Sequence, residues 1–350
     1  MKSIFDLVQA PVISTYYTTA ASNNIPYLGS LLFPAEKQQG LDLSWIRGHN
    51  GLPVSLAPSA FDAKAPVRDR IGIAKIETEM PFFRESFRIG EKERQELLKV
   101  MSGMNSAIAD PIIKKVYQDA KTLVDGAGVI PERMIMQLLS TGKIKIASKD
   151  GQAYEYDYKH PTKHKTTLAG SAKWSNTESA DVVSDILDWM DQVETDTGNR
   201  PTRAICTRKT WKNIVNNKKI RLDINPIGGE NIIVTDKMMK EYFETKLQLQ
   251  ISVYTKKFAT EVGGAGENFY PDDHFTLLPD GDLGKTYYGT TPEEADLVSG
   301  QSQAQVSIVN TGVAITTIME PHPVNSITIV SEIVLPSFEA IDSVFIAKVG

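Results

Sequence analysis

The sequence predicts an α+β protein built around one long helix. A helical periodicity runs from Asp110 to Gly142, and about a hundred residues with little helical signal precede it. After it, short helices and strands interleave, and hairpins are frequent. This mixture is typical of α+β proteins rather than of a doubly wound parallel sheet.

The long helix is predicted over residues 110–141. Asp110 can cap its N-terminus, and Pro111 fits the first helical position, where a backbone N–H has no partner in any case. Gly142 is the residue type expected just past a helix end. The apolar residues that share one helical face are Ile112, Ile113, Val116, Ala120, Leu123, Val124, Ile135, Leu138 and Leu139.

This helix is expected to consist of two pieces. Gly126 and Gly128 should interrupt it, and Pro131 should restart it, because glycine and proline are poor residues for a helix interior. If the two pieces run nearly in line, they span roughly 45 Å at 1.5 Å per residue.

Length and composition bound the class of protein. At 350 residues, two or three domains can form. The formal net charge of −5 argues against a general nucleic-acid binder, but not against a protein that encloses nucleic acid. Cys206 is the only cysteine, so no intramolecular disulfide can form and a reducing compartment is the natural setting. No apolar run approaches the ~20 residues that span a membrane, and Asp6 and Gln9 argue against a secretion signal.

The first forty residues contain aromatic side chains but no pattern that could bury a face of its own. One reading is a frayed terminus. The other is an arm that becomes ordered against a neighbouring subunit, which the apolar content favours because disordered tails contain few aromatics. The apolar residues concerned are Ile13, Tyr16, Tyr17, Tyr27, Leu31, Leu32 and Phe33.

Residues 41–80 predict a protruding two-stranded ribbon. Apolar residues alternate over 41–45 and 71–76, and a polar stretch with three prolines separates these two segments. An isolated hairpin is barely stable in water, so the ribbon should lie on another domain or on its own core, and the residues alone leave both options open. The charged residues of the middle stretch are Asp62, Lys64, Arg68, Asp69 and Arg70.

The C-terminal half reads as short elements with clear end signals. Asp150-Gly151 predicts a hairpin between strands at 143–146 and 154–158. Ser175 and Glu178 form a capping box for a helix through Val193. Further helices are capped by Thr207, by Thr235 or Asp236, and by Thr291, and further strands are predicted at 203–206, 232–234, 249–254, 275–278, 286–288, 306–309, 327–335 and 344–349.

The search for catalytic chemistry finds no convincing site. His160 and His164 could bind a metal if they shared a helix face, but Pro161 indicates a solvated loop and no carboxylate or cysteine completes the set. Cys206 is read as a small buried hydrophobe. A local basic patch could face a polyanion, although nearby acids dilute it; it comprises Arg208, Lys209, Lys212, Lys218, Lys219 and Arg221.

Five segments carry a resemblance to a known family. They are MPFFRES at 80–86, LLSTGKIKI at 138–146, AKWS at 172–175, NFYPDDHFTLLPDGDLGKTYYG at 268–289 and ITIVSEIVLPSFEAIDSVFIAKV at 327–349. In this order and spacing, the chain resembles the major capsid proteins of tailed bacteriophages, specifically the lambda-like major capsid protein E family, over nearly its whole length.

The resemblance implies an HK-ninety-seven-like fold with five parts. These are an N-terminal arm at 1–40, an extended loop at 41–80, a peripheral domain at 81–178 with the spine helix at 110–141, an axial domain at 179–324, and return strands of the peripheral domain at 325–350. The arm and loop residues expected to contact neighbouring subunits are Tyr16, Tyr17, Phe33, Trp45, Asp62, Lys64, Arg68, Asp69 and Arg70. Gly126, Gly128 and Pro131 are expected to form a hinge in the spine helix.

The implied function is structural. The protein would self-assemble through hexamers and pentamers into an icosahedral shell that encloses double-stranded DNA without sequence-specific binding, with no enzymatic activity, cofactor, metal or membrane. Expected partners are a scaffolding protein, a portal protein and a decoration protein, with assembly in the host cytoplasm and final location in the virion. Two alternatives stay open at this point: an encapsulin-type nanocompartment shell of the same fold, and a metal-dependent hydrolase using His160 and His164.

Overall fold

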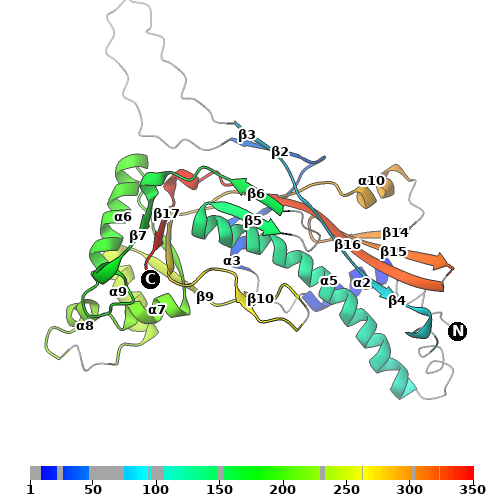
Figure 1. Cartoon of the computed structure of the whole chain (residues 1–350), viewed down its shortest axis with the longest axis horizontal. Coiled ribbons are helices and arrows are strands. Elements are labelled where there is room, and N and C mark those ends of the chain that lie inside the picture. The colour runs from blue at the N-terminus through cyan, green and yellow to red at the C-terminus, as the bar shows by residue number, and fades with distance from the viewer. Residues whose placement is uncertain are drawn as a thin grey trace, which may run out of the picture. The chain divides into compact units, whose positions relative to one another are not determined.

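The computed structural model describes residues 9–21, 27–46, 75–93, 95, 106–147, 153–228, 233–261, 263–300, 304–322 and 324–350 (Figure 1). The chain divides into two compact units, each assembled from three stretches of sequence. The first unit takes Met1–Leu43, Glu77–Glu132 and Lys285–Ser337, and the second takes Ser44–Ile76, Arg133–Gly284 and Phe338–Gly350. Helices and strands interleave in both units, which confirms the α+β class.

A six-stranded sheet forms the first unit. Its strands are β1 (Ala35–Lys37), β4 (Phe82–Ile89), β13 (Thr286–Tyr288), β14 (Gln305–Val309), β15 (Val313–Pro321) and β16 (Val324–Pro336). The long strand β16 is central and pairs antiparallel with β15, β4 and β13. Its β-branched residues suit a strand that is buried on both faces. Strands β13, β14 and β15 therefore share a sheet with β16.

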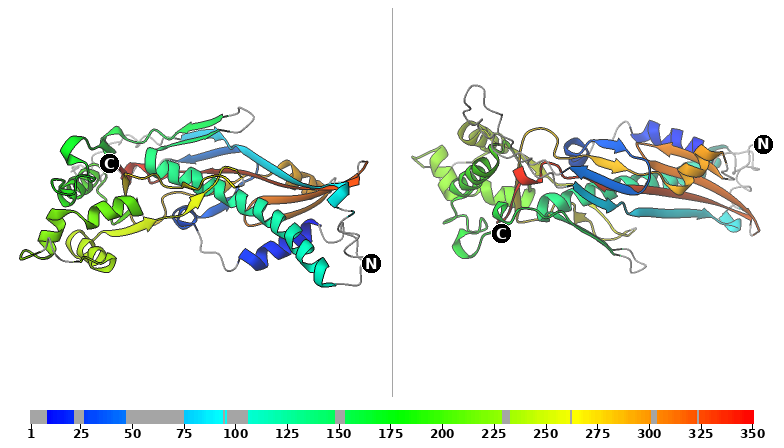
Figure 2. Two further views of the ribbon diagram at one scale, coloured as in Figure 1. Left: turned by 60° about the horizontal axis from the view of Figure 1, so that its bottom comes forward. Right: turned by 90° about the horizontal axis from the view of Figure 1, so that it is seen from above.

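The core of the first unit lies where two helices meet this sheet. Helix α2 (Ala10–Ala21) buries Ala10, Ile13 and Tyr17, which are spaced as one helical face. These side chains pack with sheet residues such as Val309 and Val330 and with the middle of helix α5 (Ser106–Thr141). In the right view of Figure 2, the blue helix α2 lies beside the orange strand β14. The first forty residues therefore do bury a face, and they do so against their own chain.

Two short elements follow α2 along the arm. Helix α3 (Leu28–Leu32) buries Leu32, and the following Phe33 is fully buried. Strands β2 (Asp42–Ile46) and β3 (Lys75–Glu79) then pair as a two-stranded sheet, in agreement with a ribbon in this region. The polar residues predicted between those strands lie outside the described residues.

A five-stranded sheet organises the second unit. Its strands, in spatial order, are β7 (Lys165–Thr167), β17 (Phe345–Lys348), β12 (His274–Leu278), β8 (Arg203–Thr207) and β9 (Gln250–Tyr254). Strand β12 is antiparallel to both of its neighbours, while β17–β7 and β8–β9 are parallel pairs. Two hairpins complete the strands: β5 (Lys143–Ala147) with β6 (Ala153–Asp157), and β10 (Lys257–Phe258) with β11 (Glu267–Asn268).

Aromatic side chains form the core of the second unit. Trp174 is fully buried, stacks on Trp189 with ring centroids 5.6 Å apart, and meets Phe275 edge-on at 5.0 Å. Its indole N–H donates to Asp185 Oδ2 at 2.9 Å, so the polar atom of this buried ring is satisfied. The helices of this unit are α6 (Val182–Thr197), α7 (Arg208–Val215), α8 (Lys218–Ile224) and α9 (Asp236–Leu247), with α10 (Pro292–Ser299) in the first unit.

Helix α5 is one continuous helix of 36 residues, about 54 Å long at 1.5 Å per residue. It runs through Gly126, Gly128 and Pro131, so the predicted interruption is wrong. It also begins upstream of the predicted cap at Asp110, where Ala107 and Ala109 have high helix propensity. Gly142, with φ +72°, ends it as predicted.

Several local predictions are confirmed and others are wrong. Thr207, Thr235 and Thr291 each accept a backbone N–H at a helix start, as predicted. The capping box at Ser175 is wrong, because Asp181 caps α6 by accepting Ser184 N–H at 3.2 Å. The predicted strand at 232–234 is absent from the described residues 233–234, and β15 was not predicted at all. Within the described residues, no helix is long and apolar enough to cross a membrane.

We predict that Gly289→Ala destabilises the first unit. A Cβ there would lie 2.6 Å from Ile333 Cγ2 and 2.8 Å from the Gly40 carbonyl oxygen, so strand β16 or the arm must shift. Overpacking of this kind costs about 1–3 kcal/mol in the free energy of unfolding, measurable by urea denaturation. Gly90→Ala is the matched control, because a Cβ there meets no atom within 4 Å. Equal urea midpoints for Gly289→Ala and Gly90→Ala would contradict the close packing around Gly289.

Candidate functional site

Three of the residues expected to contact neighbouring subunits are buried within their own chain. Tyr17 is 8% exposed, Phe33 is 0% exposed and Trp45 is 5% exposed. Tyr17 belongs to the α2 face on the first sheet, and Trp45 stacks on Tyr158 with ring centroids 5.4 Å apart. These side chains are largely covered by their own chain, and their expected role in contacts between subunits stays a prediction.

The other expected contact residues have different outcomes. Tyr16 is 36% exposed and stacks on Tyr117 of α5 at 5.2 Å, so it is accessible on the surface of the first unit. The charged residues of the extended loop lie outside the described residues; they are Asp62, Lys64, Arg68, Asp69 and Arg70.

The expected hinge lies where α5 passes from the first unit to the second. The unit boundary falls between Glu132 and Arg133, one residue beyond Pro131. Pro131 has no N–H to donate to the carbonyl four residues earlier. A Cβ on Gly126 would meet no atom within 4 Å, and one on Gly128 would meet only the Tyr27 ring at 3.8 Å. Packing in this conformation therefore does not require either glycine.

A buried carboxylate ties the arm to α5. Glu132 is 2% exposed, and its Oε2 accepts the Gly29 N–H of α3 at 2.9 Å. Its charge contributes to a raised pKa of Tyr27, for which burial is the larger cause. Sequence reasoning missed this residue, although a glutamate one turn from the apolar Ile135 and Met136 was a usable signal.

The two histidines of the HPTKH segment are buried, so the expected solvated loop is wrong. His160 is 8% exposed and His164 is 2% exposed. His160 places Nδ1 3.1 Å from the Pro161 carbonyl oxygen and Nε2 3.1 Å from that of Val344. His164 Nε2 lies 3.1 Å from Asp196 Oδ2, at the end of a 3₁₀ turn, η1 (Thr162–His164). These partners hold the segment against the second unit.

Neither histidine belongs to a metal site in the described part of the chain, where no group of three or more histidine, cysteine, aspartate or glutamate side chains could hold an ion. Cys206 is buried, and burial raises the pKa of its thiol to about 12. A thiol that stays protonated at neutral pH is a poor nucleophile, and the prediction of a small buried hydrophobe is confirmed.

The basic patch predicted at 208–221 is largely neutralised. Arg208 contacts Asp236 at 2.6 Å, Lys209 contacts Asp273 at 2.7 Å and Lys219 contacts Asp181 at 2.9 Å. Exposed pairs of this kind add little stability, but they cancel most of the local field. The dilution expected from Asp223 and Glu230 comes from other acids instead, because Asp223 pairs with Lys246 and Glu230 lies outside the described residues.

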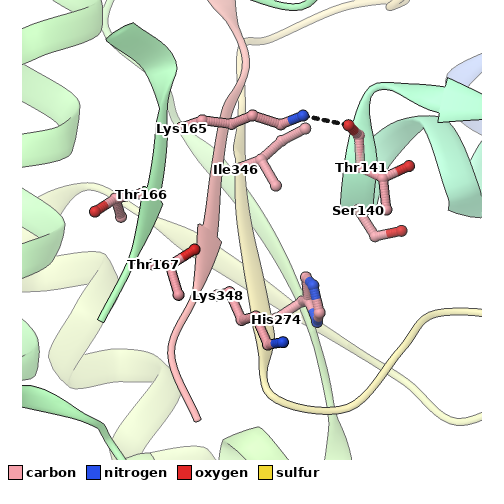
Figure 3. A pocket seen from close by; sticks show the side chains of 8 residues that line it. All are labelled: Ser140, Thr141, Lys165, Thr166, Thr167, His274, Ile346 and Lys348. Atoms are coloured by element: carbon pink, nitrogen blue, oxygen red, sulfur yellow. Dashed lines mark hydrogen bonds between the residues drawn. The ribbon is translucent and has the colours of Figure 1, made fainter. Parts of the chain in front are cut away.

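A different basic pocket lies on the second unit's sheet, on the face opposite the aromatic core (Figure 3). It has a volume of about 370 Å³ and no acidic residue lines it. Lys165 reaches across to donate to the Thr141 carbonyl at the C-terminus of α5, as the dashed line in Figure 3 marks. The lining residues are Ser140, Thr141, Lys165, Thr166, Thr167, His274, Ile346 and Lys348.

The fold recurs in two solved structures. A putative capsid protein of a prophage from Escherichia coli CFT073 aligns with a TM-score of 0.61 at 16% identity, covering 98% of this chain and 99% of that one. A phage-related protein from Bordetella bronchiseptica RB50 aligns with a TM-score of 0.56 at 14% identity, covering 97% of each chain. No curated protein matches the chain.

An α+β chain with a long helix, two units and this likeness to a capsid protein has the HK-ninety-seven-like fold of shell-forming proteins. The chain belongs to the phage major capsid protein E family, whose model matches residues 14–349. It is a structural, non-enzymatic component of the virion that self-assembles into the icosahedral head shell of a phage. The fold, family and structural role expected from the sequence are confirmed.

We predict that the stability of the second unit decreases below neutral pH because of His160. Burial lowers its pKa to about 4, with a further contribution from the Lys165 ammonium. The unfolded histidine titrates near 6.5, so between pH 6.5 and 4 the unfolded chain binds a proton that the folded chain does not. The contribution of His160 to the free energy of unfolding is therefore complete above pH 6.5. As the pH falls toward 4, the free energy of unfolding decreases by up to about 3 kcal/mol.

Urea unfolding at pH 7 and at pH 4.5 measures this effect. The pH dependence of the unfolding free energy should be smaller in His160→Gln than in the native chain. His322→Gln, which removes an exposed histidine, should leave it unchanged. The same pH dependence in all three proteins would contradict the role of His160.

Proposed function

We propose that the head shell formed by this chain encloses double-stranded DNA and retains it by confinement, without reading its sequence. Family membership across residues 14–349 is the observation that carries this proposal. The charge distribution supports it, because the net charge is −5 and the basic patch at 208–221 is mostly ion-paired. Such a surface gives little general attraction for a polyanion.

In this proposal, each part of the fold has its own role in the shell. The first unit serves as the peripheral domain together with the arm, and residues 179–284 of the second unit serve as the axial domain. We place this boundary at 284 instead of 324 because β13, β14 and β15 pair in the sheet of β16. Tyr16 and residues 47–74 of the extended loop are the candidates for contacts with neighbouring subunits.

Assembly in this proposal proceeds through hexamers and pentamers, with a scaffolding protein, a portal protein and a decoration protein as further partners. Many separate contacts per subunit can each be weak while a closed shell is stable, because every contact made raises the effective concentration for the next. One chain must also occupy several slightly different positions in such a shell, which requires a place where the subunit can bend.

The proposed bending point is the segment from Gly126 to Pro131. Two glycines and a proline weaken the helix there, and packing does not require the glycines. The boundary between the compact units follows one residue after Pro131. A helix that is intrinsically weak at this junction can bend without breaking the cores on either side.

Purified particles test the proposed cargo directly. Negative-stain microscopy should show closed shells, and nuclease-treated particles from infected or induced cells should retain double-stranded DNA. Particles that contain protein cargo and no DNA would replace the phage-genome proposal with a nanocompartment, which the sequence left open.

The double substitution Gly126→Ala with Gly128→Ala tests the hinge. Alanine favours a helix over glycine by about 1 kcal/mol per position, so the thermal midpoint of the subunit should rise. If bending is required, the yield of closed shells should fall while the smaller ring-shaped assemblies persist. Gln118→Ala, on the same helix, is the control and should assemble normally. Normal shell yield in a stabilised double variant would rule out the hinge.

A further inference from the structure

The basic pocket of the second unit brings together side chains that are far apart in the sequence. Strand register pairs His274 with Lys348 and Lys348 with Thr167, across β12, β17 and β7. Lys165 pairs with Ile346, and these two residues lie two positions before Thr167 and Lys348 on their strands. Side chains two positions apart on a strand point to the same face, so all four share it. Three adjacent strands therefore present two lysines, a histidine and a threonine hydroxyl to one pocket (Figure 3).

The C-terminus of α5, which borders this pocket, does not repel an anion as a bare helix end would. Its last carbonyl groups are capped: Lys165 donates to Thr141, Thr276 Oγ1 donates to Leu139 at 2.7 Å, and Gly142 N–H donates to Leu138 at 2.8 Å. Capping groups of this kind offset the negative end of the helix dipole.

The Lys348 side chain is exposed in the described structure. The described residues provide no carboxylate or hydrogen-bond partner for its ammonium, whereas Lys209 and Lys219 are each paired with an aspartate. The acid nearest in sequence to His274 is Asp273, which pairs with Lys209 on the opposite side of the strand. The pocket therefore carries positive charge that the subunit itself leaves uncompensated.

The other two polar groups in the pocket are already oriented. His274 Nδ1 lies 2.9 Å from the Asp272 carbonyl oxygen, which holds the ring and leaves Nε2 directed elsewhere. Burial, followed by repulsion from Lys143, lowers the pKa of Lys165, while the charge of Asp157 acts in the opposite direction. A bound anion would relieve that repulsion.

We propose that this pocket is a binding site for a phosphate-type oxyanion, with Lys348 as its free cation and Lys165, His274 Nε2 and the Thr167 hydroxyl as further donors. Lysines combined with hydroxyl groups are a usual way to hold phosphate oxygens. The ligand is either free inorganic phosphate or a phosphate of the enclosed nucleic acid, and only the latter source depends on the proposed function.

Lys348→Gln in the full-length chain is the test, because the substitution keeps the backbone pairing of Lys348 and removes an ammonium group that has no hydrogen bond or ion pair within the described structure. Two probes are used: inorganic phosphate, followed by the broadening of its phosphorus NMR line, and a short labelled DNA duplex, followed by fluorescence anisotropy at several salt concentrations. Loss of one charge-assisted contact should weaken binding about three- to tenfold, and for DNA it should lower the salt slope by about one.

Lys212→Gln is the matched control, because it removes an exposed lysine of the same unit outside the pocket. An effect of Lys348→Gln on inorganic phosphate alone assigns the site to the free ion, and an effect on both probes assigns it to nucleic-acid phosphate as well. Equal behaviour of the native chain and Lys348→Gln, or an equal loss in Lys212→Gln, overturns the proposal. Shell assembly by Lys348→Gln, checked by microscopy, shows separately whether the structural function is intact.

Discussion

The architecture depends on one helix staying continuous through two separately packed units. Helix α5 carries two glycines and a proline in its interior, which together cost several kcal/mol of helix propensity. The packing on either side outweighs this cost. Ala120, Val124 and Ala127 lie in the core of the first unit, and the residues from Met134 to Leu139 are almost all buried in the second unit. Burial in the tertiary structure thus keeps the helix continuous at residues where local propensity alone would end it.

The same balance explains which parts of the fold could be predicted from the sequence. Helix caps such as Thr207 and Thr291 depend on contacts within one turn, so local reasoning found them. The predicted interruption of α5 was wrong because it rested on the low helix propensity of glycine and proline and not on the packing around them. Strand β15 was missed although its β-branched residues suit a strand and short turns join it to both of its antiparallel partners, β14 and β16.

The expected contact residues show a different limit of sequence reasoning. An apolar face on a helix such as α2 indicates that something covers it, but the pattern is the same whether the cover belongs to the same chain or to a neighbour. Tyr17, Phe33 and Trp45 are covered by their own chain. The basic pocket could not be predicted for a related reason. Lys165, His274 and Lys348 share one face only because β17 pairs antiparallel with β12 and parallel with β7, in registers that the sequence does not reveal.

Charge placement connects the fold with the proposed role of a shell that encloses DNA. A wall that bound DNA along its whole surface would hold the genome tightly and oppose its movement during packaging and release, since each phosphate contact adds a salt-sensitive increment of affinity. In this subunit most cations of the patch at 208–221 are offset by aspartates, and the net charge is negative. The pocket at Lys348 is one place where a cation of the described chain has no acidic partner. A few localised contacts on an otherwise neutralised surface can position a polyanion without immobilising it.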